Sequence, residues 1–168
     1  QRGVAGGAEE QGRAPVLAEL GWRWMRAGEA ERAEAVQSEA LALRPDDIEL
    51  RLDRAIARAE LRRWWDAIDD LNHAHELAPE RSEVLVLRAE AYRRVEAPEL
   101  ALDDLERVLA LEPENAEALM QRGLVRFEMG DPEAARQDWH RVVELAPESE
   151  AGAAARQNLQ QMEQQDGG

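Results

Sequence analysis

The chain has 168 residues, of which 44% are hydrophobic and 34% charged, and its formal net charge is −15. This charge opposes binding to DNA, RNA or an anionic membrane, and the absence of cysteine excludes disulfides, thiol catalysis and thiolate metal sites. No run reaches the roughly 20 apolar residues of a membrane helix, and the abundance of alanine, leucine, glutamate and arginine favours an all-α protein.

Residues 1–13 are rich in glycine, and we expect them to form a disordered N-terminal arm. The chain begins at Gln1 rather than Met, so we expect that a segment was removed, either by a signal peptidase or at a cloning boundary. All 21 cationic residues are arginine, which we attribute to the codon usage of a GC-rich, bacterial genome. The periplasm is favoured over the cytoplasm as the compartment.

From residue 14 the sequence repeats with a fixed period. A proline returns every 34 residues, at Pro45, Pro79, Pro113 and Pro147, which divides the chain into four repeats, 14–47, 48–81, 82–115 and 116–149. The eighth position of the repeat always holds a tiny residue and the twentieth always holds alanine: Gly21, Ala55, Ala89 and Gly123, then Ala33, Ala67, Ala101 and Ala135. Self-similarity at such a period is typical of helical repeat arrays.

Each repeat reads as two helices separated by a short breaker. Gly28 and Gly130 stand where a first helix would end in a left-handed cap, and Pro98 and Pro132 stand where a second helix would begin. We call the first helix of a repeat its A helix and the second its B helix. Tiny residues at positions eight and twenty allow the two helices to approach closely.

The first repeat carries the pattern that identifies a known family. Its residues are Leu17, Leu20, Gly21, Trp24, Ala33, Ala40 and Pro45. The pattern resembles the tetratricopeptide repeat over residues 14–149. Two departures are clear: arginine replaces the usual leucine at Arg54, Arg88 and Arg122, and the usual tyrosine at Arg58 and Arg126. The resemblance implies an all-α, right-handed α-solenoid of about four helix-turn-helix repeats.

Residues 150–164 read as one further helix that caps the array. Ala151, Ala154, Ala155, Leu159 and Met162 form an apolar stripe, and the other faces carry glutamine, glutamate and arginine. We expect residues 165–168 to form a disordered tail.

The sequence gives little support for catalysis. His73 and His75 form an H-x-H pair, but residues two apart on a helix point roughly 200° away from each other, so they cannot clamp a metal ion together. Paired carboxylates such as Asp69 and Asp70 are typical of solvated faces in a charge-rich chain, and phosphate-loop and nucleophile motifs are missing. We therefore predict no enzyme activity, no catalytic residues, no cofactor and no metal site.

The family resemblance places the binding groove on the A helices, and the chain carries a mixed apolar and acidic set there. The predicted groove residues are Trp22, Met25, Glu49, Leu52, Asp53, Ile56, Val86, Glu90, Arg93, Met120, Leu124 and Phe127. An apolar stripe with an acidic rim favours a protein or peptide segment that is apolar or amphipathic and positively charged. The hypothesis is a non-catalytic protein-protein interaction scaffold.

Three alternatives stay open. The repeats could join copies of the chain as a homodimer, the groove could be filled by the arm, the last helix or a second copy, or it could hold a small molecule or lipid. Some family members clamp a partner's C-terminal carboxylate with cationic residues; the matching positions here, Ala18, Trp22, Asp53, Glu83 and Leu87, supply no cation. Trp65 follows Trp64 directly and either caps a turn or marks a second contact patch.

Overall fold

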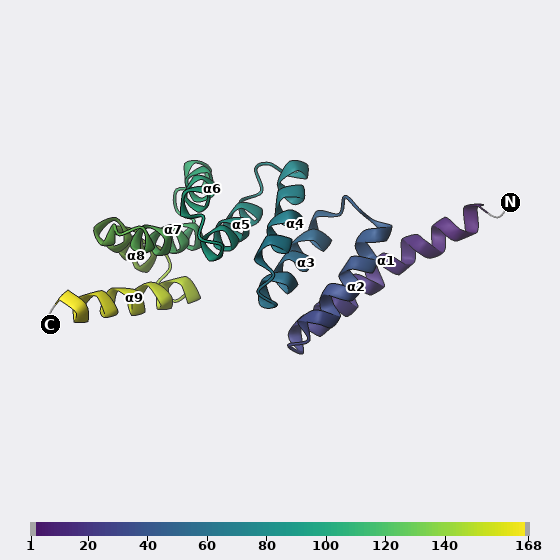
Figure 1. The fold of residues 1–168 in the computed structure, drawn as a ribbon, viewed down its shortest axis with the longest axis horizontal. Helices are drawn as coiled ribbons and strands as arrows, with labels where there is room; N and C mark the ends of the chain where they lie inside the picture. The colour runs from purple at the N-terminus through teal and green to yellow at the C-terminus, as the bar shows by residue number, and fades with distance from the viewer. Residues whose placement is uncertain (1–2, 167–168) are drawn as a thin grey trace. The chain divides into compact units, whose positions relative to one another are not determined.

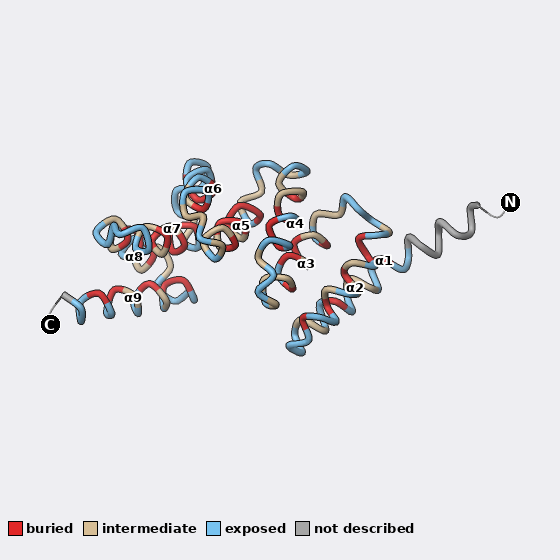
Figure 2. The backbone as a smooth tube through the Cα atoms, in the orientation of Figure 1, coloured by how far each residue is buried: buried red, intermediate tan, exposed pale blue. Residues whose placement is uncertain are grey.

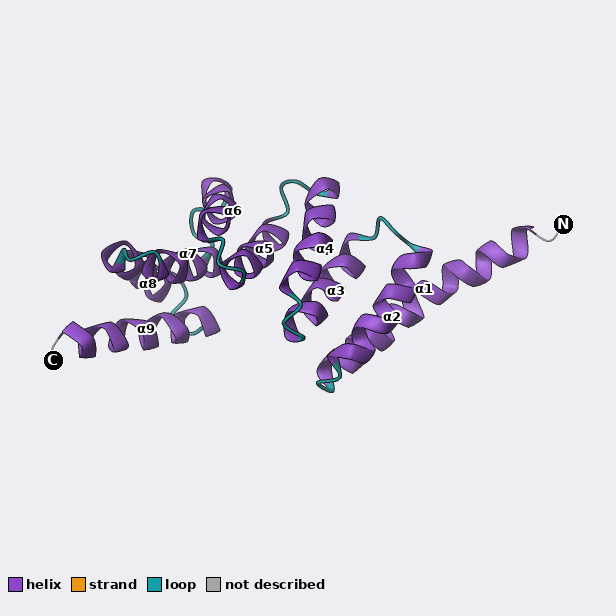
Figure 3. Ribbon diagram, viewed as in Figure 1, coloured by secondary structure: helices purple, strands orange, loops and turns teal. Residues whose placement is uncertain are grey.

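The computed structural model describes the backbone of residues 3–166 and the side chains of residues 12–165. Nine helices joined by short turns, and no strands, make up this part of the chain (Figures 1 and 3). Their bounds are α1 Gly3–Arg26, α2 Ala30–Leu43, α3 Ile48–Glu60, α4 Trp64–Leu77, α5 Ser82–Arg94, α6 Pro98–Leu111, α7 Ala116–Glu128, α8 Pro132–Leu145 and α9 Glu150–Asp166. The all-α expectation is confirmed.

The helices alternate as A and B helices: α1, α3, α5 and α7 are A helices, and α2, α4, α6 and α8 are B helices. The chain divides into two compact units, which we call the N-terminal half, up to Val84, and the C-terminal half, from Leu85. The division falls inside α5. In the N-terminal half α1 packs on α2 and α2 on α3, which packs on α4; in the C-terminal half α6, α7, α8 and α9 pack in the same sequential manner.

The turn between the A helix and the B helix has the same backbone conformation in all four repeats. Its fifteenth repeat position is left-handed throughout, with φ of 76° at Gly28, 57° at Arg62, 59° at Glu96 and 85° at Gly130. The backbone N–H of the third residue after the helix then donates to a carbonyl five positions back, as Glu29 does to Trp24 at 2.9 Å. This is the hydrogen bond that ends a helix in a Schellman motif, so the turn is also built without glycine.

Polar side chains cap the N-termini of three helices, α3, α7 and α9. Asp47, Asn115 and Ser149 occupy the last position of their repeats, and each accepts a hydrogen bond from the backbone N–H three residues later. Each bond satisfies one of the donors that a helix leaves free at its start. The turn that contains the repeated proline therefore lies after one helix and supplies the N-cap of the next.

The N-terminal segment differs from expectation. The glycine content of residues 1–13 predicts disorder, but α1 begins at Gly3 and runs through Pro15 to Arg26. Adding residues to an existing helix costs much less than nucleating one, and residues 14–26 supply the nucleus. Residues 1–2 and 167–168, which belong to the predicted arm and tail, lie outside the described residues.

Small residues bring the A and B helices together as predicted from positions eight and twenty. Ala33, Ala67, Ala101 and Ala135 are all at most 1% exposed. At Gly123, a Cβ atom would lie 2.3 Å from the Nε1 atom of Trp139, which is itself 2% exposed. The close approach of α7 and α8 therefore requires glycine at this point.

The arginines that depart from the family pattern form ion pairs inside the repeats. Arg54 donates to both carboxylate oxygens of Asp70, at 2.6 and 2.9 Å, and Arg88 and Arg122 bind Asp104 and Asp138 in the same way, each 16 residues further on. These three aspartates are at most 4% exposed. The pair links the A helix to the B helix of one repeat.

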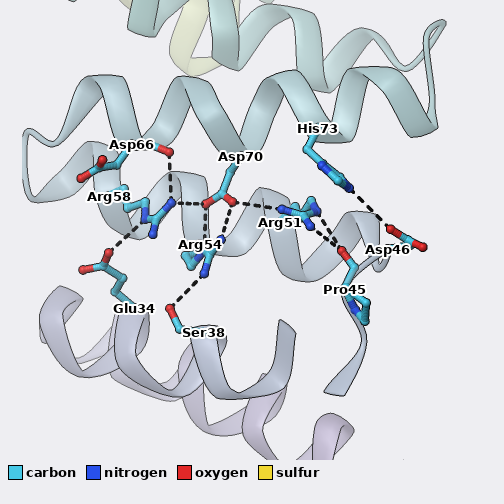
Figure 4. A network of polar contacts seen from close by, with 10 residues as sticks. All are labelled: Glu34, Ser38, Pro45, Asp46, Arg51, Arg54, Arg58, Asp66, Asp70 and His73. Carbon is cyan, nitrogen blue, oxygen red and sulfur yellow. Dashed lines mark hydrogen bonds and ion pairs between the residues drawn. The ribbon is translucent and has the colours of Figure 1, made fainter. Parts of the chain in front are cut away.

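Around Asp70 the pair grows into a network (Figure 4). Arg58 donates to Asp70 at 2.9 Å and to Glu34 of α2 at 2.9 Å, and Arg54 reaches Ser38 of α2 at 3.1 Å. The network therefore joins α2, α3 and α4. In the C-terminal half Arg126 supports Asp138 in the same manner, at 3.0 Å.

The last helix, α9, covers the core of the C-terminal half. Ala151, Ala155, Leu159 and Met162 are each at most 9% exposed and belong to one apolar cluster with residues of α7 and α8. Buried and exposed residues alternate along α9 in Figure 2. Within the described residues, none of the helices combines the length and apolar character that crossing a membrane requires.

Candidate partner-binding surface

In the N-terminal half, two large apolar side chains of the predicted groove are open to solvent. Trp22 of α1 is 51% exposed and Ile56 of α3 is 36% exposed, and they share the ninth position of their repeats. The guanidinium of Arg26 lies 4.8 Å from the centre of the Trp22 ring, within the range of a cation–π contact. Met25 is half-buried beside them on α1.

Three predicted groove residues are buried instead. Leu52, Val86 and Met120 are 2%, 9% and 6% exposed, so they offer little surface to a partner. All three stand at the fifth position of their repeats, where the first repeat has Ala18. A position that is apolar in every repeat serves packing of the helices, and this uniformity is the signal that distinguishes it from the ninth position.

The carboxylates beside Ile56 fall into two kinds. Glu49 and Glu83 both bind Arg81, the latter at 2.8 Å, and the hydrogen bond from Arg81 lowers the pKa of Glu49. Asp53 differs, because it is half-buried and no cationic partner for it occurs among the described residues. Burial raises the pKa of Asp53, and the nearby charges of Glu49, Asp47 and Glu83 raise it further.

Ile56 lies three residues after Asp53 on α3, so the two side chains lie on one face of that helix. The N-terminal half therefore presents an apolar surface, Trp22 with Ile56, next to a carboxylate that lacks a counter-charge. Such a site favours a group that brings both methylene surface and a positive charge.

The C-terminal half carries a second, smaller set. Phe127 of α7 is 39% exposed and lies 5.9 Å from Trp139, centre to centre, while Leu124 is half-buried one turn earlier. Arg93 donates to Glu128 at 2.7 Å, which ties α5 to α7, and Glu90 is half-buried on α5. A hollow of about 420 Å³ opens beside this ion pair, lined by Arg93, Glu96, Pro98, Glu99, Glu128 and Met129.

The histidines and Trp65 lie away from these sets. Nε2 of His73 lies 3.5 Å from Oδ1 of Asp46, in an exposed contact. In the part of the chain that the structure describes, no three histidine, aspartate or glutamate side chains gather closely enough to hold a metal ion. Trp65 is 64% exposed at the start of α4, and its two interpretations, a cap on a turn or a second contact patch, both stay predictions.

Solved structures of other proteins share this fold. A MamA fragment from Desulfovibrio magneticus RS-1 is 23% identical, with 92% of this chain and 85% of that one covered and a TM-score of 0.78. A thermophilic TPR protein of Thermus thermophilus is 21% identical, with coverage of 89% and 82% and a TM-score of 0.77. At these identities the likeness shows the fold alone.

A third structure contains a bound peptide. The first TPR domain of Spaghetti (RPAP3), bound to the HSP90 peptide SRMEEVD, is 28% identical, with 70% of this chain and 94% of that one covered and a TM-score of 0.67. A comparison with curated protein sequences gives no match. The tetratricopeptide repeat profile matches residues 20–91 and 89–160, well over half of the sequence. The chain therefore belongs to the tetratricopeptide repeat family.

Proposed function

We propose that this protein is a non-catalytic interaction module that holds an amphipathic, positively charged protein segment on its A-helix face. The observation that carries the proposal is Asp53, a half-buried carboxylate without a cationic partner among the described residues, next to the exposed Ile56. Trp22 extends the apolar surface on α1.

The physical reason for the charge preference is the cost of the unpaired carboxylate. Asp53 is partly removed from water and faces three other carboxylates, so a guanidinium or ammonium from a partner would relieve both effects. The apolar part of the segment would cover Trp22 and Ile56, at about 25 cal/mol for each Å² of apolar surface removed from water.

The family supports the coarse part of this proposal, since tetratricopeptide proteins are typically non-catalytic scaffolds that bind proteins or peptides. The Spaghetti domain binds SRMEEVD, a peptide with three acidic residues among its last four. Here the positions of a carboxylate clamp hold Asp53 and Glu83 in place of cations. The partner should therefore have the opposite charge.

The test is fluorescence anisotropy with three labelled 14-residue peptides: an amphipathic helix of leucine and arginine, the same peptide with glutamate in place of arginine, and a scrambled arginine peptide. We expect the first to bind best. Asp53→Asn and Ile56→Glu should each weaken its binding about tenfold, which corresponds to ~1.4 kcal/mol. Glu106→Gln, on the exposed face of α6, is the matched charge control and should leave binding unchanged.

Circular dichroism of each variant separates binding from folding. Ile56 is already 36% exposed, so Ile56→Glu should keep the helical content. Equal affinity for the arginine and glutamate peptides, or an Asp53→Asn variant that binds as well as the parent chain, would contradict the proposal.

A further inference from the structure

Arg81 differs from the residues that hold the last position of the other repeats. Asp47, Asn115 and Ser149 stand there, and each accepts a hydrogen bond from the backbone N–H three residues later. An arginine side chain has no acceptor atom, so Arg81 cannot cap α5 in this way. Capping of the helix therefore does not account for an arginine at this position.

The guanidinium of Arg81 binds two carboxylates instead. Nη1 and Nη2 both donate to Glu49 of α3, the latter at 3.2 Å, and Nη2 also donates to Glu83 of α5 at 2.8 Å. Both glutamates hold the second position of their repeats. A two-point contact that also links a second carboxylate is the kind of exposed ion pair that does influence the charge around it.

Apart from that contact, the two glutamates are open to solvent. The side chains of Glu49 and Glu83 are 69% and 57% exposed, and the side chain of Arg81 is 31% exposed. A cation brought by a partner would therefore compete with Arg81 for these carboxylates.

Asp53 lies one helical turn after Glu49 on α3 and has no such contact. The carboxylates whose charges act together here, which we call the acidic set, are Asp47, Glu49, Asp53 and Glu83. Arg81 binds two members of the set, and Arg44 lies 3.9 Å from a third, Asp47. Within the described residues, Asp53 is thus the one member of the acidic set without a cationic partner.

We propose that Arg81 determines where the groove of the N-terminal half takes up a partner's cation. It occupies Glu49 and Glu83, which without it form a second anionic subsite, and so directs the cation to Asp53 beside Ile56. The inference rests on the proposed function and describes the partner more closely. The preferred segment has one cationic side chain among apolar neighbours, in place of basic residues at successive helical turns.

Glu60 does not affect this choice. Seven residues, about two helical turns, separate it from Asp53, and Ile56 lies between them. Glu60 is exposed, and no contact joins it to Arg81 in the part of the chain that the structure describes. It is therefore equally available to a partner whether or not Arg81 is present.

The test compares two labelled 14-residue amphipathic helices of leucine and glutamine. One carries a single central arginine, and the other carries two further arginines, four residues before and four residues after it. This spacing copies the four residues from Glu49 to Asp53 and covers both directions of the peptide on the groove. At physiological salt, the parent chain should bind the two peptides within about threefold of each other.

Arg81→Asn removes the cation and supplies the capping residue of the third repeat. It should raise the preference for the three-arginine peptide about tenfold over that of the parent chain. Adding Glu49→Gln to this variant should remove most of the gain. Arg141→Gln is the matched control, because Arg141 of α8 also binds two exposed carboxylates, at 3.1 and 3.2 Å, and its loss changes the net charge equally. It should leave the preference unchanged.

Thermal unfolding separates this role from a structural one. Exposed ion pairs add little stability and asparagine provides a cap, so the midpoint of Arg81→Asn should equal or exceed that of the parent chain. A midpoint lower by more than about 3 °C would assign Arg81 to the fold and overturn the inference.

An unchanged peptide preference in Arg81→Asn, or an equal rise in Arg141→Gln, would overturn it too. Either result leaves the proposed function intact if the parent chain binds the single-arginine peptide. If the parent chain binds neither peptide, the proposed function is wrong and the role of Arg81 is wrong with it.

Discussion

Asp53 shows how one residue can work against the fold and in favour of binding. Burial and three neighbouring carboxylates raise its pKa above the ordinary value. A residue of this kind keeps a proton in the folded chain at a pH where the unfolded chain has lost it. Folding stability therefore falls as the pH rises through the folded pKa, and the ionised form at neutral pH is destabilising.

Asp53→Asn should consequently raise the thermal midpoint at pH 7, by about 1–2 °C, since solvent screens a half-exposed carboxylate. The gain should shrink as the pH falls to 3.5, where the carboxyl is mostly protonated in both states. Binding of the arginine peptide should decline as the pH falls through the raised pKa. Thermal melts and titrations at pH 7, 5 and 3.5 check both trends, and a lower midpoint for Asp53→Asn at pH 7 would show that Asp53 is paired.

At the scale of the helices, the recurring feature is the arginine–aspartate pair between the A and B helix. The planar guanidinium of Arg88 donates to both oxygens of Asp104 at 2.7 Å, and its Cζ atom lies 5.6 Å from the centre of the Tyr92 ring. The same hydrogen bond raises the pKa of Arg88. Lysine cannot reproduce this two-point contact, so codon usage is not needed to explain arginine at these positions.

The first repeat offers a natural control for this pair, because it has Leu20 and Val36 at the two positions. Asp104→Asn removes the charge of the carboxylate that binds the buried Arg88 guanidinium at two points, and it should cost about 3–5 kcal/mol of unfolding free energy. The double variant Arg88→Leu with Asp104→Val copies the first repeat and should recover most of that loss.

Urea unfolding measures both effects, with the exposed Arg107→Leu as a control for loss of an arginine. If the double variant is as unstable as Asp104→Asn, the ion pair adds to the free energy of unfolding beyond neutralising its own two buried charges.

The sequence predicts the helices well and the surface less well, for physical reasons. Position eight is tiny where a side chain of the B helix packs against the A-helix backbone, as Trp139 does at Gly123 and Gln37 does at Gly21. In the second repeat the ninth and fifth positions both hold apolar residues, yet Ile56 is exposed and Leu52 is buried. Helical spacing gives the face of a residue but not what lies opposite it. The partners of Arg54 and Arg88 are likewise 16 residues away and outside any local pattern.

At the scale of the whole chain, each half depends on the packing of consecutive helices. In the C-terminal half, α9 buries Ala151, Ala155, Leu159 and Met162 in the shared cluster. Ending the chain after Ser149 would expose the surfaces that they cover. At about 1–2 kcal/mol for each buried apolar side chain, the C-terminal half should lose on the order of 5 kcal/mol.

Tryptophan fluorescence can follow this loss of stability separately in the N-terminal half and in the C-terminal half. Trp139 belongs to the C-terminal half, and the other four tryptophans belong to the N-terminal half. A variant with phenylalanine at those four positions reports on Trp139 alone, and truncation should lower its unfolding midpoint strongly. Trp139→Phe reports on the N-terminal half, whose midpoint should fall less, since coupling in repeat proteins passes between neighbours. Equal shifts would show that the halves unfold together.

The helices α1 and α9 differ in the chemical character of the residues that they expose. α9 turns Arg156, Gln157, Gln160 and Gln161 to solvent, whereas α1 turns out Val16 and Leu20. Glutamine-rich surface is well hydrated, so covering the outer side of α9 would release little free energy. Covering Val16 and Leu20 would release more, at about 25 cal/mol for each Å² of apolar surface removed from water, so α1 gains more than α9 from any added contact.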